Sequence, residues 1–435
     1  MANLLNISHI SNEELRKIAY ECGFMKRRCK KIDAPYFLAN LCLSSIEGSP
    51  SYNDLAAHYH SEYNICASKQ AFWKRVDPSC VLFLQLVLAL IIHQKFDNDD
   101  IKAIKANGIY KRVIVQDSTI IKLPLRLFDV FSGVANAYTA VCNARIQGVY
   151  DLNSGRFLSF SIDPYSKNDL SAAPELELLE GDLVLRDRGY SCNDEISRHV
   201  KAGADCIFRH KFNSMYIDPD SGKEINLMAL LKEHGNLDME VCLNNKERTN
   251  VRLIAMPVNP EIANLRRLKA KSEMRRHNPS AELLFLMSWT IFITTIPQSC
   301  ADPKKILRIY KLRWRIEIIF KMFKSHMSFS KVHNVSQNQL NILLTARLIM
   351  IVTCTHLIYL PCNTIIAHTY GRQLSLLKLS NYLMKNTSQL INILNHKYSI
   401  HDNIRSYIYS LMRYCTYDKR NRQNFSQLAN EILLS

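Results

Sequence analysis

The sequence predicts an α/β protein whose mixed sheet is flanked by helical regions at both ends of the chain. Residues 1–105 carry helical periodicity, and the period changes near residue 111, where short β-branched runs begin to alternate with helical segments. Residues 336–435 return to amphipathic helix. The middle of the chain runs in the order strand, hairpin, helix, strand, which is the order expected of a mixed sheet with helices packed on it.

The composition is that of a globular and strongly basic protein. Its 435 residues suffice for two to four domains, and 47% of them are hydrophobic. The formal net charge is +17 and the pI is about 9.3. Such an excess of positive charge indicates a polyanionic partner, most often nucleic acid. A merely basic soluble protein is the alternative.

Several kinds of site are disfavoured. Only 12 glycines occur, and neither G-x-x-x-x-G-K-[ST] nor G-x-G-x-x-G appears, so we expect no glycine-rich phosphate-binding loop. The 13 cysteines form no C-x-x-C pair, which fits reduced thiols in an intracellular protein. His58 and His60 lie close together but lack cysteine partners, so we expect no zinc site there.

The apolar segments are interpreted as core elements. Residues 1–17 lack the basic-then-apolar order of a signal peptide. The apolar runs 81–92 and 348–360 are shorter than the ~20 residues that a membrane span needs. We therefore expect both runs to be buried helices.

Residues 51–76 resemble a helix-turn-helix. We expect a short amphipathic helix, a turn near residues 63–65 and a second helix that opens at Ser68. The second helix offers side chains of the types that contact bases and phosphates, namely Lys69, Gln70, Lys74 and Arg75. An ordinary helix pair is the alternative.

The predicted core elements alternate along residues 111–211. A β-branched strand is bounded by Pro124, and two alternating runs around Gly155 predict a hairpin. The remaining elements are predicted as a helix over 171–180, a strand over 182–187, a helix over 193–203 and a strand over 205–211.

Residues 213–285 differ from the segment before them. Their short strand patterns and a basic limb near their end are interpreted as an inserted, partly β subdomain. Residues 289–297 return to the strand pattern. Asp302 can then cap a helix that has Pro303 at its first position, and this helix is predicted to run through residues 310–326.

Four polar side chains share one stripe of that helix. At about 100° per residue, Tyr310, Arg313, Glu317 and Lys324 fall within a sector about 60° wide that borders the apolar face. The stripe is therefore expected where the helix meets both a core and a cleft. The alternative is an i,i+4 Arg–Glu pair on a solvated face, worth roughly 0.2–0.5 kcal/mol.

Two further acids end predicted strands. Asp117 closes the run VIVQD and Asp187 closes the run DLVLRD. Carboxylates at the ends of strands lie where ligands tend to bind in α/β folds. They can hold Mg²⁺, and two such ions make an in-line phosphoryl displacement feasible. The alternative for each residue is an ordinary strand-end cap or turn.

These motifs together resemble the bacterial insertion-sequence transposases of the DDE class, in particular the branch marked by Y-(2)-R-(3)-E-(6)-K. The four residues of the polar stripe match that spacing without a gap. The stretch QDST around Asp117 is similar to the first acidic motif of the family, and DRGY at 187–190 is similar to the second. The resemblance covers about residues 111–330.

The resemblance implies a ribonuclease-H-like core in which Asp117, Asp187 and Glu317 bind two Mg²⁺ (or Mn²⁺) ions. It implies DNA-contacting roles for five residues, of which the basic ones suit phosphates: Tyr310, Arg313, Lys324, Arg188 and Trp289. Similar enzymes use a tryptophan near Trp289 to stack a base flipped out of the duplex. Plain core packing is the alternative for this residue.

The function implied is that of a DNA transposase, which cleaves strands at transposon ends and transfers them into target DNA. Its partners would be the double-stranded terminal inverted repeats, the target DNA and a second copy of the chain, and its location the bacterial cytoplasm in association with the nucleoid. Two alternatives remain open. One is a non-catalytic or domesticated DNA-binding protein of transposase origin, and the other is a metal nuclease without strand transfer.

We predict five regions along the chain. They are a helical DNA-binding region with the candidate helix-turn-helix (1–105), the first part of the ribonuclease-H-like core (106–212), the β-rich insertion (213–285), the completion of the core with the signature helix (286–335), and a helical region expected to dimerise (336–435).

Overall fold

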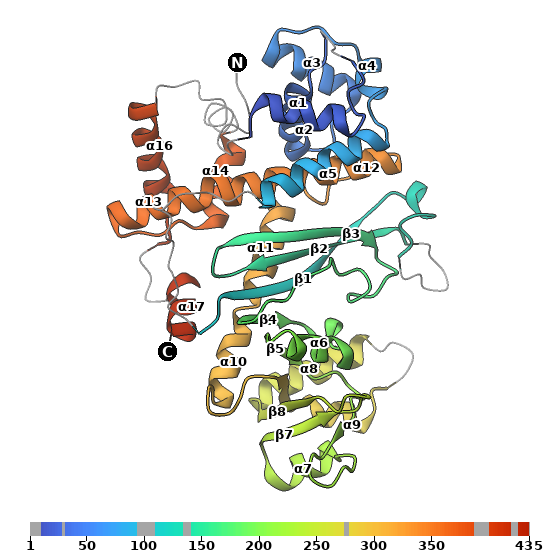
Figure 1. Cartoon of the computed structure of the whole chain (residues 1–435), viewed down its shortest axis with the longest axis vertical. Coiled ribbons are helices and arrows are strands. Elements are labelled where there is room, and N and C mark those ends of the chain that lie inside the picture. The colour runs from blue at the N-terminus through green and yellow to red at the C-terminus, as the bar shows by residue number, and fades with distance from the viewer. Residues whose placement is uncertain are drawn as a thin grey trace.

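A nine-stranded mixed sheet runs through the middle of the molecule (Figure 1). The computed structural model describes residues 10–27, 31–93, 109–133, 141–273, 278–386, 400–418 and 425–434. The strand order is β3-β2-β1-β4-β5-β9-β8-β7-β6. The strands are β1 (Arg112–Lys122), β2 (Asn143–Asp151), β3 (Arg156–Pro164), β4 (Asp182–Arg186), β5 (Asp205–Arg209), β6 (Tyr216–Ile217), β7 (Leu237–Leu243), β8 (Asn250–Pro257) and β9 (Trp289–Thr294).

The first five strands form the ribonuclease-H-like core that was expected. β1, β2 and β3 pair antiparallel, whereas β4 pairs parallel with β1 and β5 parallel with β4. Every residue of β4 is buried, in line with its run of Leu and Val. Gly155 turns the β2–β3 hairpin with φ of +68°, a backbone conformation that glycine adopts without steric cost. The helix α6 (Asn193–Lys201) follows β4, as predicted.

The other four strands continue the same sheet. β9 pairs antiparallel with β5, and β8, β7 and β6 follow outward from it. The short strands expected between residues 213 and 285 are therefore present and are joined to the core through β9. Three helices accompany them, namely α7 (Leu227–His234), α8 (Pro260–Glu273) and α9 (Ala281–Leu286). The last part of the expected basic limb, residues 274–277, lies outside the described residues.

Helices from both ends of the chain pack together above the sheet (Figure 1). α12 lies against both α2 and α5, and all three contribute to one large apolar cluster. The N-terminal helices are α1 (Asn12–Glu21), α2 (Ala34–Glu47), α3 (Tyr52–Tyr63), α4 (Lys69–Trp73) and α5 (Pro78–His93). The C-terminal helices are α12 (Gln337–Val352), the π-helix η5 (Thr353–Tyr359), α13 (Leu360–Tyr370), α14 (Leu376–Lys385), α16 (Ile400–Tyr414) and α17 (Phe425–Leu434).

The two apolar runs are core helices, as expected. The continuous helical stretch Gln337–Tyr370 has the length and apolar character of a membrane span, but 94% of its apolar window is buried inside the protein. The run 81–92 lies within α5, and the buried residues of that helix include Phe83, Leu84 and Val87. Both segments are therefore buried within the protein as core helices.

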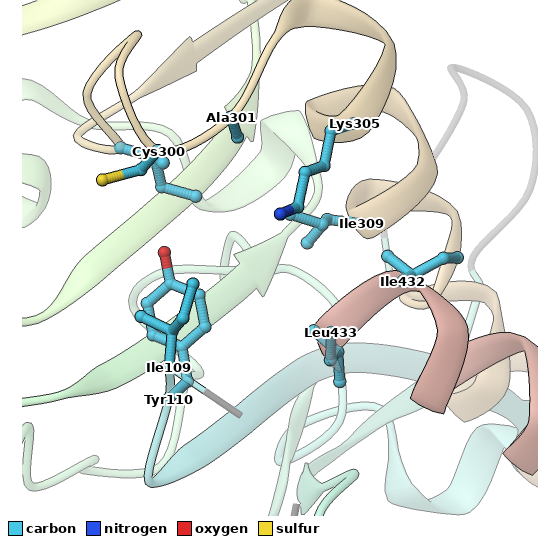
Figure 2. A pocket seen from close by; sticks show the side chains of 9 residues that line it. Ile109, Tyr110, Cys300, Ala301, Lys305, Ile309, Ile432 and Leu433 are labelled. Carbon is cyan, nitrogen blue, oxygen red and sulfur yellow. The ribbon is translucent and has the colours of Figure 1, made fainter. Parts of the chain in front are cut away.

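The C-terminal helix α17 packs against α10 (Pro303–Lys311), with an ion pair between Arg308 and Glu431 at 2.5 Å. Beside this contact is a small pocket into which Lys305 extends from α10 (Figure 2). Its lining comes from distant parts of the sequence: Ile109, Tyr110, Ile296, Cys300, Ala301, Lys305, Ile309, Ile432 and Leu433. The pocket is lined by residues that precede β1, by α10 and by α17, so it lies where the C-terminal helix contacts the core.

The prediction of a helix over residues 171–180 is wrong. This segment has no helical backbone, and its Leu176 is buried in a small cluster with Ile114, Val149 and Val184. Pro174 lacks the N–H that a helix needs, and alternate leucines reach the sheet from an extended chain. The carbonyl oxygens are satisfied by side chains instead: Arg198 donates to Leu176 O at 3.1 Å and Arg112 to Glu177 O at 3.0 Å.

The signature helix is two helices rather than one. Asp302 caps α10 by accepting a hydrogen bond from Lys305 N, with Pro303 first in the helix, as predicted. α10 ends at Lys311 and α11 (Trp314–His326) begins three residues later. Leu312 and Arg313 between them make the tighter i→i+3 backbone bonds of a 3₁₀ turn.

Candidate active site at the junction of two parallel strands

Asp117 and Asp187 lie side by side where the pairing of β1 with β4 ends. The last register pair of these parallel strands is Gln116 with Arg186, and each aspartate is the next residue. The expectation that both aspartates end strands is correct for Asp187 and wrong for Asp117. β1 continues past Asp117 to Lys122, paired there with β2 only. The two acids are brought together by the point at which the β1–β4 pairing ends, and not by the end of β1.

Arg313 connects Asp117 to Glu317. Its Nη1 atom lies 2.9 Å from Asp117 Oδ2, and its Nη2 atom lies 2.5 Å from Glu317 Oε1. The Arg313 side chain is 7% exposed, so this is no ion pair on a solvated helix face. The alternative of a weak surface pair is therefore wrong. The fork of one guanidinium joins a strand acid to a helix acid across 200 residues of sequence.

The charges of this cluster influence one another. The pKa of Asp117 is raised to about 6, mainly by burial and to a smaller degree by the nearby Glu317 and Asp187, while Arg313 and the N–H of Ser118 lower it. Burial tends to lower the pKa of Arg313, but Tyr310 and the three acids raise it, and the net direction is upward. Arg313 is therefore a permanent cation, and it balances acids that would otherwise repel one another.

The other two signature residues also reach the strands. Tyr310 is buried, and its hydroxyl donates to Asp187 Oδ1 and to Arg186 O, each at 3.3 Å. Lys324 Nζ donates to Ile120 O at 2.7 Å, farther along β1. All four signature side chains therefore face the strands that carry the two aspartates. The helical-wheel prediction of a common stripe agrees with this arrangement.

The donor set suits a divalent cation, although the acids do not form a closed cluster. Within the described residues, no three acidic, His or Cys side chains stand close enough together to hold a metal ion. Asp117 and Glu317 nevertheless converge on one cationic group, the guanidinium of Arg313. Carboxylate oxygens are the ligands that Mg²⁺ prefers. Asp117 and Glu317 supply oxygen atoms of this kind, and Arg313 places a positive charge between them.

Arg188 and Trp289 occupy different settings. Arg188 is exposed in the short 3₁₀ turn η4 (Arg188–Tyr190), directly after Asp187. Trp289 begins β9, is half-buried, and its ring lies 6.3 Å from that of Phe285. Its indole nitrogen has no hydrogen-bond partner among the described residues. Trp289 thus belongs to the packing of the second half of the sheet.

The sequence analysis overlooked an exposed aromatic residue beside Glu317. Trp314 is 56% exposed and Ile318 is 50% exposed, three residues before and one residue after Glu317 on α11. Lys321 is exposed on the same face of α11, and Lys311 is exposed at the end of α10. The spacing 311, 314, 318, 321 is a helical stripe, so the pattern was visible in the sequence. It combines an aromatic plane with two ammonium groups next to the acids.

The expected helix-turn-helix segment holds two helices, and the second opens after Ser68 as predicted, but it ends at Trp73 and leaves Lys74 and Arg75 beyond it. α3 ends at Tyr63, with Asn64 in the left-handed conformation, and Ser68 caps α4 by accepting from Ala71 N. α4 is only five residues long. Its exposed residues are Lys69, Gln70 and Trp73, followed by exposed Lys74, while the half-buried Arg75 donates to Ala71 O at 3.0 Å.

Residues 110–353 match the family model described as the transposase DDE domain, which is more than half of the chain. The chain belongs to the DDE transposase family. The matched range contains β1 to β9 and both signature helices, together with the three acids and Arg313.

Relatives of this DDE transposase are transposases of insertion sequences. The chain is 26% identical over 371 residues to the transposase for IS231B of Bacillus thuringiensis subsp. berliner, covering 80% of this chain and 77% of the relative. For the IS231C transposase of the same subspecies the identity is 25% over 433 residues, covering 93% and 89%. For the IS1151 transposase of Clostridium perfringens it is 23% over 444 residues, covering 97% and 93%.

A solved structure of the piggyBac transposase synaptic complex with hairpin DNA has a TM-score of 0.44 and 9% identity, covering 98% of this chain and 88% of that one. The ribonuclease-H-like assignment of this DDE transposase rests on its own strand order. Members of the family are enzymes that act on DNA, so DNA is the polyanionic partner that the net charge of +17 indicated.

Proposed function

We propose that this DDE transposase cleaves DNA strands at the ends of an insertion sequence and transfers the freed 3′-hydroxyl into target DNA. One observation carries the proposal. Asp117 and Asp187 are neighbours at the edge of the parallel strands, and Arg313 draws Glu317 toward Asp117. Three carboxylates, from β1, from the residue after β4 and from α11, thereby lie near one another beside exposed cationic side chains.

In this proposal Asp117, Asp187 and Glu317 hold Mg²⁺ or Mn²⁺. Bound divalent ions supply activation of the attacking oxygen and stabilisation of the leaving one. Tyr310 orients Asp187 through its hydroxyl, which donates to Oδ1 at 3.3 Å. Arg313 neutralises the acids before DNA arrives and is then placed to bind a phosphate, for which its planar fork is suited.

DNA contacts are assigned to side chains around the acids. Arg188, Arg313 and Lys324 would bind phosphates, and Tyr310 would support them at the transposon end. The exposed Trp314 supports a stacking role better than the half-buried Trp289 does, because a base can reach its face. The spacing of the signature residues places the chain, by our proposal, in the Y-(2)-R-(3)-E-(6)-K branch.

The outer regions receive complementary roles. The N-terminal region 1–105 is proposed to read the terminal inverted repeats, with Lys69, Gln70 and Lys74 on its exposed surface. The C-terminal region 336–435 is proposed to form the dimer that brings two ends together. Action on DNA in the bacterial cytoplasm, at the nucleoid, follows from these assignments.

The test uses purified protein, Mg²⁺ and linear DNA that carries the inverted repeats flanking the gene, with a repeat-free duplex as control. Cleavage at the repeats together with joined products supports the proposal. Specific binding without cleavage would instead identify a non-catalytic DNA-binding protein of transposase origin. Cleavage without joined products would identify a metal nuclease, and either result would overturn the proposal.

A further inference from the structure

The carboxylate of Asp169 contacts residues that closely follow Asp117 and Asp187 in the sequence. Asp169 is in the loop after β3, and its Oδ1 atom accepts hydrogen bonds from Ser118 Oγ, at 2.9 Å, and from Arg145 Nη1. The Asp169 side chain is 29% exposed and that of Arg145 only 9%. Ser118 directly follows Asp117, and its backbone N–H donates to Asp117 Oδ1 at 2.8 Å. One acid outside the proposed set is therefore bonded to the neighbour of Asp117.

The same carboxylate packs closely against Gly189, in the turn after Asp187. A Cβ atom placed on Gly189 would lie 2.6 Å from Asp169 Oδ2, which is closer than real Cβ contacts. Gly189 is not one of the described glycines with a positive φ. Glycine is therefore favoured here because a larger residue lacks space, and not because of the backbone conformation. Asp169 therefore touches both acidic motifs, one through Ser118 and the other through Gly189.

A buried amide completes the connection. Gln147 Nε2 donates to the backbone oxygen of Asp169 at 2.6 Å, and Gln147 Oε1 accepts from Tyr190 OH at 2.9 Å and from Gln116 Nε2 at 3.1 Å. Gln116 and Gln147 are fully buried. Buried hydrogen bonds of this kind hold their partners in one geometry, although Gln116 Oε1 itself has no partner among the described residues. This one ties the loop of Asp169 to β1, to β2 and to the turn after β4.

The need for such a link follows from the strand pairing. The β1–β4 ladder ends at Gln116 with Arg186, so no bond of that ladder links Asp117 to Asp187, although β1 stays paired with β2 at Asp117. Asp169 connects Ser118, one residue after Asp117, with Gly189, two residues after Asp187. The separation of the two aspartates is then set by a carboxylate that is not one of the three acids.

We propose that Asp169 is a positioning residue that fixes the spacing of Asp117 and Asp187 for a divalent cation. The inference rests on the proposed function, in which those two aspartates hold the ion. Asp169 acts through Ser118 and Gly189 and is not itself a ligand, because its Oδ1 atom is committed to Arg145 and Ser118 while Oδ2 faces Gly189. Groups that orient metal ligands in this way typically account for about 10- to 100-fold in metal affinity.

The test measures Mn²⁺ binding to the full-length protein without DNA, by electron paramagnetic resonance of the free ion. For Asp169→Ala we expect the Kd for Mn²⁺ to rise about 10- to 100-fold, with folding retained as judged by circular dichroism. Asp163→Ala is the matched control, because it removes an acid of β3 whose partner is the exposed Lys167, and its Kd should be unchanged. An unchanged Kd for Asp169→Ala would overturn the inference.

A double variant tests the contact with Gly189 and remains informative if Asp169→Ala folds poorly. Gly189→Ala alone should weaken Mn²⁺ binding, because its methyl group displaces the carboxylate. Gly189→Ala combined with Asp169→Ala should be no worse than Asp169→Ala alone, since the clash is gone. Fully additive losses would contradict the inference. If Asp169→Ala does not fold, Ser118→Ala and Gly189→Ala decide, and unchanged affinity in both would overturn it.

Asp117→Ala separates this inference from the proposed function. If Asp117→Ala leaves Mn²⁺ binding intact, the ion does not bind where we place it and the proposed function fails with the inference. If Asp117→Ala abolishes binding while the Asp169 and Gly189 variants match the wild type, only the positioning role is lost.

Discussion

Arg313 holds Asp117 and Glu317 with the two arms of one guanidinium, at 2.9 and 2.5 Å, although the two acids lie on different elements. A cation is thus already present where the proposed function requires a metal ion. Two like charges on either side of a buried arginine repel each other once that arginine is removed. This relationship between Arg313 and the acids leads to the first prediction.

Arg313→Ala should destabilise the protein in metal-free buffer by about 2–3 kcal/mol, because it leaves two partly buried carboxylates, 18% and 34% exposed, without their counter-charge. Divalent ions should restore more stability to this variant than to the wild type. Thermal unfolding with EDTA and with Mn²⁺ measures both effects. Arg126→Ala, which removes an exposed arginine, serves as the control and should respond like the wild type. Equal stabilisation of all three proteins by Mn²⁺ would argue against the idea that Arg313 stands in for the ion.

Glu317→Gln should retain binding to the inverted repeats and lose strand cleavage. The amide keeps the size of the side chain but is a poorer ligand for Mg²⁺ than a carboxylate. Electrophoretic mobility shifts and a cleavage assay on the same DNA separate the two properties. Glu282→Gln, which changes an exposed acid of α9, should leave both unchanged. A Glu317→Gln protein that nicks DNA at the normal rate would refute the catalytic assignment.

Arg313→Ala should also reduce the salt dependence of DNA binding. Each phosphate contact adds about 0.9 to the slope of log K against log salt for duplex DNA, so the loss of one contact lowers the slope by about one. Titrations at several salt concentrations provide the slope. An unchanged slope would mean that Arg313 serves only the acids and makes no phosphate contact.

Trp314→Ala and Trp289→Ala should have opposite effects. Trp314 is 56% exposed, so its loss should leave the melting temperature unchanged and weaken end binding by about 1–3 kcal/mol, the contribution of a stacked base. Trp289 packs against Phe285 and is half-buried, so its loss should lower the melting temperature. Normal end binding by Trp314→Ala, with weakened binding by a stable Trp289→Ala, would reverse the assignment.

His356 predicts a pH dependence of stability. It is buried, and Nε2 accepts a hydrogen bond from Phe157 N at 2.8 Å, which requires an unprotonated nitrogen. Burial, with a smaller effect of Arg156, lowers the pKa of His356 to about 3. The unfolded chain binds a proton here below about pH 6.5 and the folded chain does not, so stability falls as pH drops from 6.5 toward 3.

The magnitude follows from that single proton. Its contribution to the free energy of unfolding falls by about 1.4 kcal/mol for each pH unit in this window. His356→Gln keeps an acceptor and cannot titrate, so its stability should decline less steeply with acidification. The buried His199 and the half-buried His210 titrate in both proteins, so their effects cancel in the comparison. Parallel pH profiles from urea unfolding of the two proteins would contradict this account.

Local sequence signals predicted the elements with short-range causes. The strands followed their β-branched runs, and the caps at Ser68 and Asp302 formed as their side chains require. The adjacency of Asp117 and Asp187 was also predictable, because each follows a buried run in parallel strands. The extended backbone at Leu176 was not predictable, because a short apolar run fits a helix or an extended chain equally until the surface beneath it is known.

The long-range features of the site had no such local signal. The burial of Arg313 depends on β1 lying beneath the 3₁₀ turn, about 200 residues away in sequence. Asp169 belongs to no periodic pattern, and its proposed role depends on two strands, β1 and β2, meeting Gly189 in space. The sequence singled out Glu317 through the spacing of its helix, and Asp117 and Asp187 through the strands before them. It predicted DNA contacts for Arg313 rather than the contacts with Asp117 and Glu317 that the structure shows.

Arg347 ties the two ends of the chain into one body. It is fully buried in α12 and donates to four backbone oxygens, from Ser45 and Gly48 near the N-terminus and from Phe329 and Lys331 after α11. By our assignment the first of these regions reads the transposon end and the second follows the helix of Glu317. The number of base pairs between the recognised sequence and the cut is then fixed by the rigid packing of these two regions against each other.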